Sequence, residues 1–141
     1  MTPPIVSVKW LHDHLGDPNL RVIDATTVLA HGPDQHYHNR GEEIYEAAHI
    51  PGAVFADLVD EFNDSDEVLS MVPSQAKFEA AAGRAGISEG NRVVVYDTAE
   101  DDSHEPGVSV WASRLWWQLR YEGFDDVSVL DIAQVVERSL R

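Results

Sequence analysis

The segment from Asn91 to Asp97 constrains the fold more than any other part of the chain. It contains an unbroken run of apolar side chains, Val93 to Val95 followed by Tyr96, between polar residues. A short continuous apolar run of this kind predicts a strand that is buried on both of its faces. Such strands are typical of parallel sheets that are covered by helices on both sides. We therefore predict a central strand at residues 91–97 in an α/β domain.

Other segments predict the rest of this domain. Further strands are expected at residues 21–25, 52–55 and 127–131. Helices are expected at residues 8–15, 75–85 and about 108–121. Ser7 and Ser74 are the expected N-caps of the first two helices, and Gly86 and Gly123 are expected to follow the last two. In the third helix, residues at i, i+3 and i+4 spacing are expected to face the core: Val108, Trp111, Ala112, Leu115, Trp116 and Leu119. This alternation of strands and helices predicts a small, mainly parallel sheet flanked by helices.

Size and composition limit the classes of function. The 141 residues fit one domain, and 25 acidic against 10 basic side chains give a net charge of −15. This negative charge creates an electrostatic field that repels phosphate backbones and anionic lipids. Neither nucleic acid nor a membrane surface is therefore expected as a partner. No apolar run approaches the roughly 20 residues that span a bilayer. The absence of cysteine excludes disulfides and fits a reducing compartment, so we predict a cytoplasmic protein.

The connection that follows Asp97 is the expected place for a ligand. In open α/β sheets, ligands bind beyond the carboxyl ends of the strands, where loop amides and a helix N-terminus can hold an anion. Residues 97–107, however, contain five carboxylates and no Lys or Arg. The sequence therefore predicts a loop that opposes the binding of anions.

Several motifs in order resemble the rhodanese superfamily, and in particular the N-terminal half of two-domain thiosulfate and 3-mercaptopyruvate sulfurtransferases. They are residues 46–53 (EAAHIPGA), 93–97 (VVVYD), 112–117 (ASRLWW) and 127–131 (VSVLD). The resemblance implies a rhodanese-like three-layer domain over residues 1–131. Residues 132–141 are an atypical C-terminal tail, because members of the family usually continue with a Gly-Gly turn and an aromatic-bearing helix.

The resemblance also implies that this chain is inactive by itself. In two-domain members, only the C-terminal half carries the cysteine that becomes a persulfide, and Asp97 occupies that loop position here. A carboxylate cannot replace a thiolate that accepts and releases sulfur. We expect no catalytic residue and no cofactor in this chain, whose role is then structural or regulatory. The alternative is half of a sulfurtransferase whose cysteine comes from another domain or chain.

Three residues are candidates for an interface or an accessory role. The resemblance weakly implies that His49 belongs to a polar relay facing the catalytic loop of a partner domain, but we favour a structural role in fixing the turn before the strand at 52–55. Arg114 could bind an acidic substrate, but we favour a surface role for its aliphatic stem. Trp117 lies outside the predicted core face of its helix. If a second domain is the natural partner, an exposed apolar patch and self-association are expected here.

Histidines and carboxylates gather in two polar loops. His31, His36 and His38 lie near Asp34, and His104 lies among acidic residues. Neither group has the spacing of a structural zinc site, and the acidic segment 61–67 lacks the glycine of a calcium loop. We therefore predict no metal site.

Overall fold

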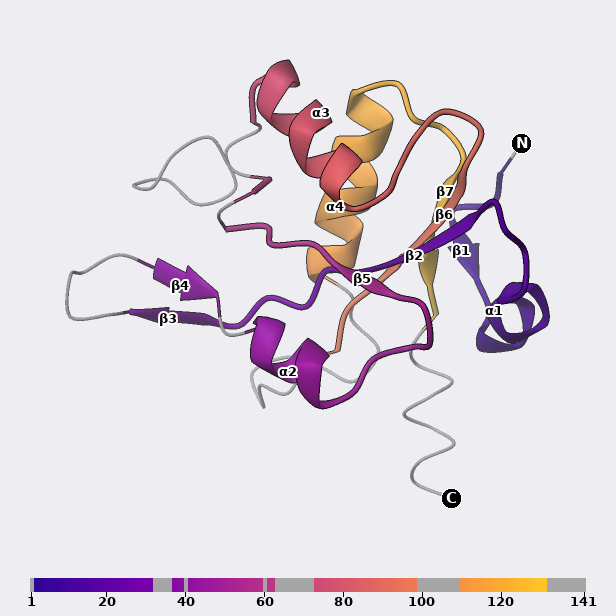
Figure 1. Cartoon of the computed structure of the whole chain (residues 1–141), viewed down its shortest axis with the longest axis horizontal. Coiled ribbons are helices and arrows are strands. Elements are labelled where there is room, and N and C mark those ends of the chain that lie inside the picture. The colour runs from indigo at the N-terminus through magenta and orange to yellow at the C-terminus, as the bar shows by residue number, and fades with distance from the viewer. Residues whose placement is uncertain are drawn as a thin grey trace.

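The central feature of the fold is a parallel five-stranded sheet (Figure 1). A computed structural model of the chain describes residues 2–31, 37–39, 41–59, 61–62, 73–98 and 110–131. The strands of this sheet are β1 (Ile5–Val6), β2 (Leu20–Asp24), β5 (Val54–Phe55), β6 (Arg92–Tyr96) and β7 (Val127–Leu130). Their order is β1-β7-β6-β2-β5, and every neighbouring pair is parallel. The strand predicted from the valine run, β6, therefore lies at the centre, as expected.

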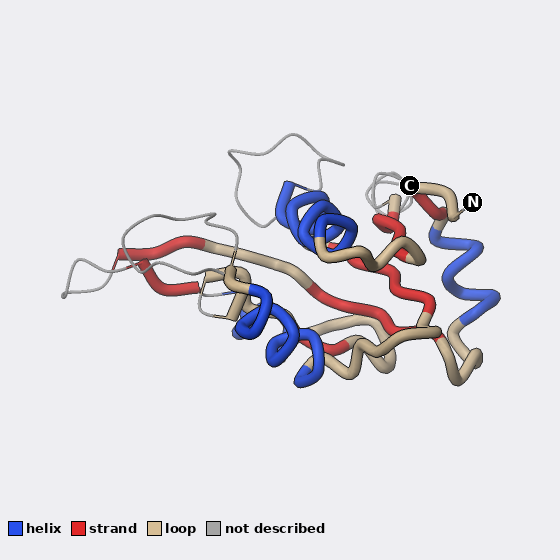
Figure 2. The backbone as a smooth tube through the Cα atoms, turned by 90° about the horizontal axis from the view of Figure 1, so that it is seen from above, coloured by secondary structure: helices blue, strands red, loops and turns tan. Residues whose placement is uncertain are grey.

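Helices cover both faces of this sheet (Figure 2). They are α1 (Val8–His14), α2 (Gly41–Ala47), α3 (Gln75–Arg84) and α4 (Val110–Tyr121). Buried side chains of α3 and α4 share one core cluster with Ile23, Val93 and Val95. The other cluster joins Leu11 of α1 to the opposite face of the same strands, with Tyr45 of α2 packed against it. The predicted three-layer α/β architecture is confirmed.

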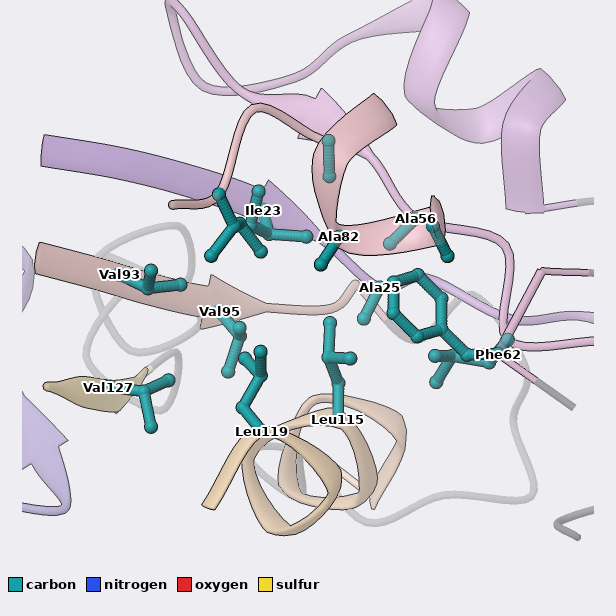
Figure 3. Close-up of a cluster of buried hydrophobic side chains, with 14 of the residues drawn as sticks. Ile23, Ala25, Ala56, Phe62, Ala82, Val93, Val95, Leu115, Leu119 and Val127 are labelled. Atoms are coloured by element: carbon teal, nitrogen blue, oxygen red, sulfur yellow. The ribbon is translucent and has the colours of Figure 1, made fainter. Parts of the chain in front are cut away.

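The two core clusters follow directly from the period of two along a strand. On β6, Val93 and Val95 point to α3 and α4, whereas Val94 and Tyr96 point to the other side. Leu115 and Leu119 of α4 project onto the first of these faces (Figure 3). Because both faces of β6 are buried, an unbroken apolar run is what this position requires.

Local signals at the helix ends are also confirmed. Ser7 caps α1 by accepting from the Trp10 amide at 3.0 Å, and Ser74 caps α3 in the same way. Gly86 and Gly123 adopt positive φ angles of 79° and 93° just after α3 and α4, a conformation that favours glycine.

The sequence prediction missed β1, α2 and the pair of strands β3 and β4, and it overestimated burial on α4. Strand β1 has only two residues, and α2 is short and carries charged side chains, so neither gives a clear periodic signal. The segment interpreted as a polar histidine loop instead contains the antiparallel strands β3 (Leu29–His31) and β4 (Tyr37–Asn39), which project from the rest of the domain (Figure 1). Trp111 and Trp116, both expected in the core, are only partly buried against it, and Val108 lies outside the described residues.

Candidate functional site

Asp97 lies where the α/β fold places ligands, at the carboxyl end of the central strand β6. Its side chain is buried, with 3% of the residue exposed. Its carboxylate oxygen Oδ2 accepts a hydrogen bond of 2.7 Å from the backbone N–H of Ala112 in the first turn of α4. This N–H is one of the donors that a helix N-terminus offers to an anion. The chain's own carboxylate therefore takes a donor that an external anion would need.

Beside Asp97, the threonine that follows β2 bonds to the threonine that follows β6. The Thr98 amide donates to Oγ1 of Thr26 at 3.0 Å, and the two threonine hydroxyls lie 3.3 Å apart. The Thr26 amide in turn donates to Oδ1 of Asp24 at 2.8 Å. Residues following β2 are in this way joined to residues following β6.

Tyr96, the last residue of β6, also belongs to this group of polar residues. Its hydroxyl accepts from the Ile50 amide at 3.1 Å, and the charge of the Asp24 carboxylate acts on it. Burial raises the pKa of the Tyr96 phenol well above its ordinary value, the Ile50 amide opposes this rise, and the Asp24 carboxylate adds to it. Tyr96 therefore stays protonated, and its hydroxyl joins the segment at Ile50 to the end of β6.

We call this group the carboxyl-edge cluster, and its members are Asp24, Thr26, Tyr96, Asp97 and Thr98. Four of its members are buried and Thr98 is exposed, and its polar groups bond to one another or to nearby backbone. Asp24 and Tyr96 were not recognised from the sequence as part of a site. The signal that could have identified Asp24 is its place as a carboxylate at the end of an apolar strand, the same pattern that drew attention to Asp97.

His49 precedes Ile50, whose amide bonds to Tyr96, but its own side chain bonds elsewhere. Its Nδ1 is 2.7 Å from the Tyr45 carbonyl oxygen, four residues earlier, and its ring stacks on Tyr45 with centroids 3.9 Å apart. Since a carbonyl oxygen only accepts, Nδ1 carries the hydrogen. Tyr45 in turn donates to the Ala53 carbonyl at 2.6 Å. His49 thus ties the end of α2 to the turn before β5, the geometry that a structural role requires.

Arg114 and Trp117 lie together on α4, which covers the opposite face of the sheet from α2. The Arg114 guanidinium is 5.7 Å from the centre of the Trp117 ring. Trp117 also stacks on Tyr121, with centroids 5.3 Å apart, and 44% of Trp117 is exposed. The prediction that Trp117 lies outside the core is confirmed. The structure therefore pairs two of the three candidate residues and separates them from His49.

The prediction of no metal site can be compared with the structure only in part. Among the residues that the structure describes, no group of three His, Asp or Glu side chains could hold a metal ion. His36, His104 and most of the acidic segment 61–67 lie outside the described residues, and nothing is placed for the side chains of His31 and His38. Within the same described part of the chain, no helix is long and apolar enough to cross a membrane.

The fold and the cluster define the class of protein. Residues 7–132 match the family model for the rhodanese-like domain, and the chain belongs to this family. The chain is 40% identical over 129 residues to thiosulfate/3-mercaptopyruvate sulfurtransferase 2 of Arabidopsis thaliana, covering 91% of this chain and 34% of that protein. It is 33% identical to 3-mercaptopyruvate sulfurtransferase of Escherichia coli, over 89% of this chain and 40% of the relative.

Solved structures give the same result. The crystal structure of SseA from Escherichia coli, a 3-mercaptopyruvate sulfotransferase, matches with a TM-score of 0.72 and 30% identity, covering 98% of this chain and 49% of that one. The chain therefore spans between about a third and a half of these relatives, and it resembles the N-terminal domain of the two-domain proteins.

Proposed function

We propose that this rhodanese-like domain is non-catalytic by itself and has a structural or regulatory role, most naturally in support of a catalytic sulfurtransferase domain. The observation that carries the proposal is the hydrogen bond from the Ala112 amide to Asp97. Sulfur transfer needs a thiolate that attacks the donor and then releases sulfur from a persulfide. At the equivalent place, this chain has a buried carboxylate that binds the first turn of α4.

The charge of the adjoining loop supports the same proposal. Beyond Asp97, residues 98–107 add four carboxylates and no Lys or Arg, and the whole chain carries a net charge of −15. Thiosulfate and 3-mercaptopyruvate are anions, so both are repelled by this field. Asp97 also competes with them for a helix amide.

The substitution Asp97→Cys tests this proposal. After incubation with thiosulfate, intact-mass measurement should show no added sulfur atom on the variant, and the variant should form no thiocyanate from cyanide. Circular dichroism of the variant establishes that it is folded. A folded Asp97→Cys protein that takes up sulfur and turns over would show that the charge argument is wrong.

A second candidate function is that the chain forms one half of a sulfurtransferase, with the cysteine supplied by another domain or chain. The specific observation in its favour is that the chain spans only part of its sulfurtransferase relatives. This proposal predicts that the chain raises the activity of a separate cysteine-containing rhodanese domain when the two are mixed. His49→Ala, compared with His14→Ala as a control on α1, would show whether His49 contributes to that increase. No change in activity on mixing would count against this candidate.

Compartment and partner remain predictions. The cytoplasmic assignment rests on the absence of cysteine, while one relative, from Arabidopsis thaliana, is named as mitochondrial. A partner domain or self-association is supported by the exposed Trp117.

A further inference from the structure

Two hollows in the surface of the described residues have mainly apolar walls but differ in charge. The first, which we call the edge groove, has a volume of about 550 Å³ and lies between α4 and the sheet edge formed by β1 and β7. Its walls include Ile5, Trp116, Trp117, Val129 and Leu130, and Asp131 is its one charged residue. The second, which we call the turn pocket, has a volume of about 220 Å³ and is lined by three carboxylates. The charge of the turn pocket favours one class of partner.

The turn pocket lies where α3 and α4 end. After each helix, a glycine with a positive φ angle is followed by an apolar residue whose amide donates back to a carbonyl of the helix. The Ile87 amide donates to the Ala82 carbonyl at 2.9 Å, and the Phe124 amide donates to the Leu119 carbonyl at 2.8 Å. In such Schellman turns, the apolar residue packs on the last turn of the helix. These four residues and Phe78 form the apolar walls of the pocket.

The turn pocket is also acidic. Glu79, Glu89 and Glu122 line it, and no Lys, Arg or His is among its lining residues. Within the described part of the chain, none of these three carboxylates forms an ion pair with a basic side chain. The C-terminal ends of α3 and α4 add partial negative charge, which favours cations at this place.

Basic side chains on neighbouring segments already have partners. Arg84 lies 4.0 Å from a carboxylate oxygen of Glu61, and Arg21 donates to the Gly86 carbonyl at 3.0 Å. The guanidinium of Arg120 lies over a tryptophan ring, 5.1 Å from its centre. The described residues therefore place no basic group of their own in the pocket.

The size of the turn pocket limits what it can hold. Pockets for drug-sized ligands measure about 300–1,000 Å³. The turn pocket has room for roughly seven water molecules at about 30 Å³ each, which is close to the number of non-hydrogen atoms in one arginine side chain. The methylene groups of an arginine can contact apolar walls, while its guanidinium bonds to carboxylates and stacks on an aromatic ring such as Phe124.

We propose that the turn pocket binds an arginine side chain presented by a partner protein. The net charge of −15 attracts a basic partner over a distance, and the pocket gives its arginine a fixed place. The pocket lies at the amino ends of β6 and β7, because residues 87–89 and 122–124 precede these strands. It is thus at the opposite end of the sheet from the carboxyl-edge cluster, and this contact does not depend on whether the domain is catalytic.

Short peptides test the proposal on the full chain by NMR. The probe is a peptide with blocked ends and one arginine between two leucines, and the control peptides carry lysine or glutamine in its place. The arginine peptide should shift the backbone amide signals of residues 86–89 and 122–124. It should bind about fivefold more tightly than the lysine peptide, because a guanidinium bonds to two carboxylate oxygens and stacks on a ring. The glutamine peptide should cause no shifts there.

Substitutions that remove one charge each distinguish the pocket from the negative charge of the whole chain. Glu122→Gln should weaken binding of the arginine peptide about tenfold, because it removes a charged acceptor. Glu89→Gln, at an exposed position of the same pocket, should weaken it in the same direction. The control is Glu46→Gln on α2, across the sheet, which should change the affinity by less than about twofold because a distant charge is screened.

Each result decides the proposal. Shifts confined to the pocket residues, and weakened by the two pocket substitutions but not by Glu46→Gln, support it. Shifts spread over the surface and weakened equally by all three substitutions would show non-specific attraction and would overturn it. Absence of shifts with the arginine peptide, or equal binding of the arginine and lysine peptides, would overturn it as well.

Discussion

The carboxyl-edge cluster and the edge groove show opposite kinds of surface on one sheet. At the carboxyl ends of β2 and β6, where α/β folds bind ligands, buried polar groups are satisfied by one another and by backbone amides. At the β1–β7 edge, an apolar groove remains open in the described part of the chain. The difference is that the chain's own polar groups fill the edge where α/β folds bind ligands, whereas the β1–β7 edge presents exposed apolar side chains.

The largest effect is expected from Asp97→Ala. This substitution leaves the Ala112 amide without its partner in a buried place, which costs about 1–3 kcal/mol of unfolding free energy. Asp125→Ala, which removes an exposed carboxylate, is the control and should change stability by less than about 0.5 kcal/mol. Urea denaturation measures both. Equal and small effects would show that Asp97 is not a structural residue.

A somewhat smaller effect is expected from Tyr96→Phe. The substitution keeps the buried ring but removes the hydroxyl that accepts from the Ile50 amide, so a loss of about 1.5 kcal/mol of unfolding free energy is expected. Tyr121→Phe is the matched control, because Tyr121 is 64% exposed. If the two variants unfold at the same urea concentration, the cluster does not hold β2, β6 and the Ile50 turn together.

The pH dependence of the unfolding free energy gives a second test of the role of Tyr96. The pKa of Tyr96 is raised in the folded state, so its contribution is fully present below the ordinary tyrosine value of about 10 and decreases as the pH rises above it. The unfolding free energy of the unchanged protein should therefore fall more steeply above this pH than that of Tyr96→Phe. Denaturation curves at several alkaline pH values test this difference, and parallel curves would contradict it.

The smallest effect on folding is expected at the groove. Trp117→Ala removes a ring that is nearly half exposed, so the unfolding free energy should change by less than about 1 kcal/mol. The same substitution in residues 1–131 should reduce concentration-dependent self-association measured by sedimentation, because it removes much of the exposed apolar surface. Lys77→Ala, on α3, is the control for surface changes elsewhere. If self-association is unchanged, Trp117 is not part of the surface through which the chains associate.

Sequence patterns predicted the parts of the fold whose signals are local. The run at Val93–Val95 identified the central strand, and Ser7, Ser74, Gly86 and Gly123 identified helix ends because each satisfies a local geometric need. Strand β1 was missed because two residues show no periodicity, and its pairing with β7 is a long-range contact.

The candidate site was predictable only in outline. Asp97 was identified from its position after β6, but its bond to Ala112 joins residues 15 apart across a connection whose path no local pattern specifies. Asp24 lies beside Tyr96, whose hydroxyl bonds to Ile50, only because of the register of β2 against β6. The edge groove was anticipated only as an exposed Trp117, because its other walls come from distant parts of the chain.

The most direct test of the central claim is thiocyanate formation by the purified, unchanged chain from cyanide, with thiosulfate or 3-mercaptopyruvate as the sulfur donor. The buried Asp97 and the absence of cysteine predict no product above the level without protein. Product that persists in proportion to this chain through further purification would mean sulfur transfer without a thiolate and would contradict the account.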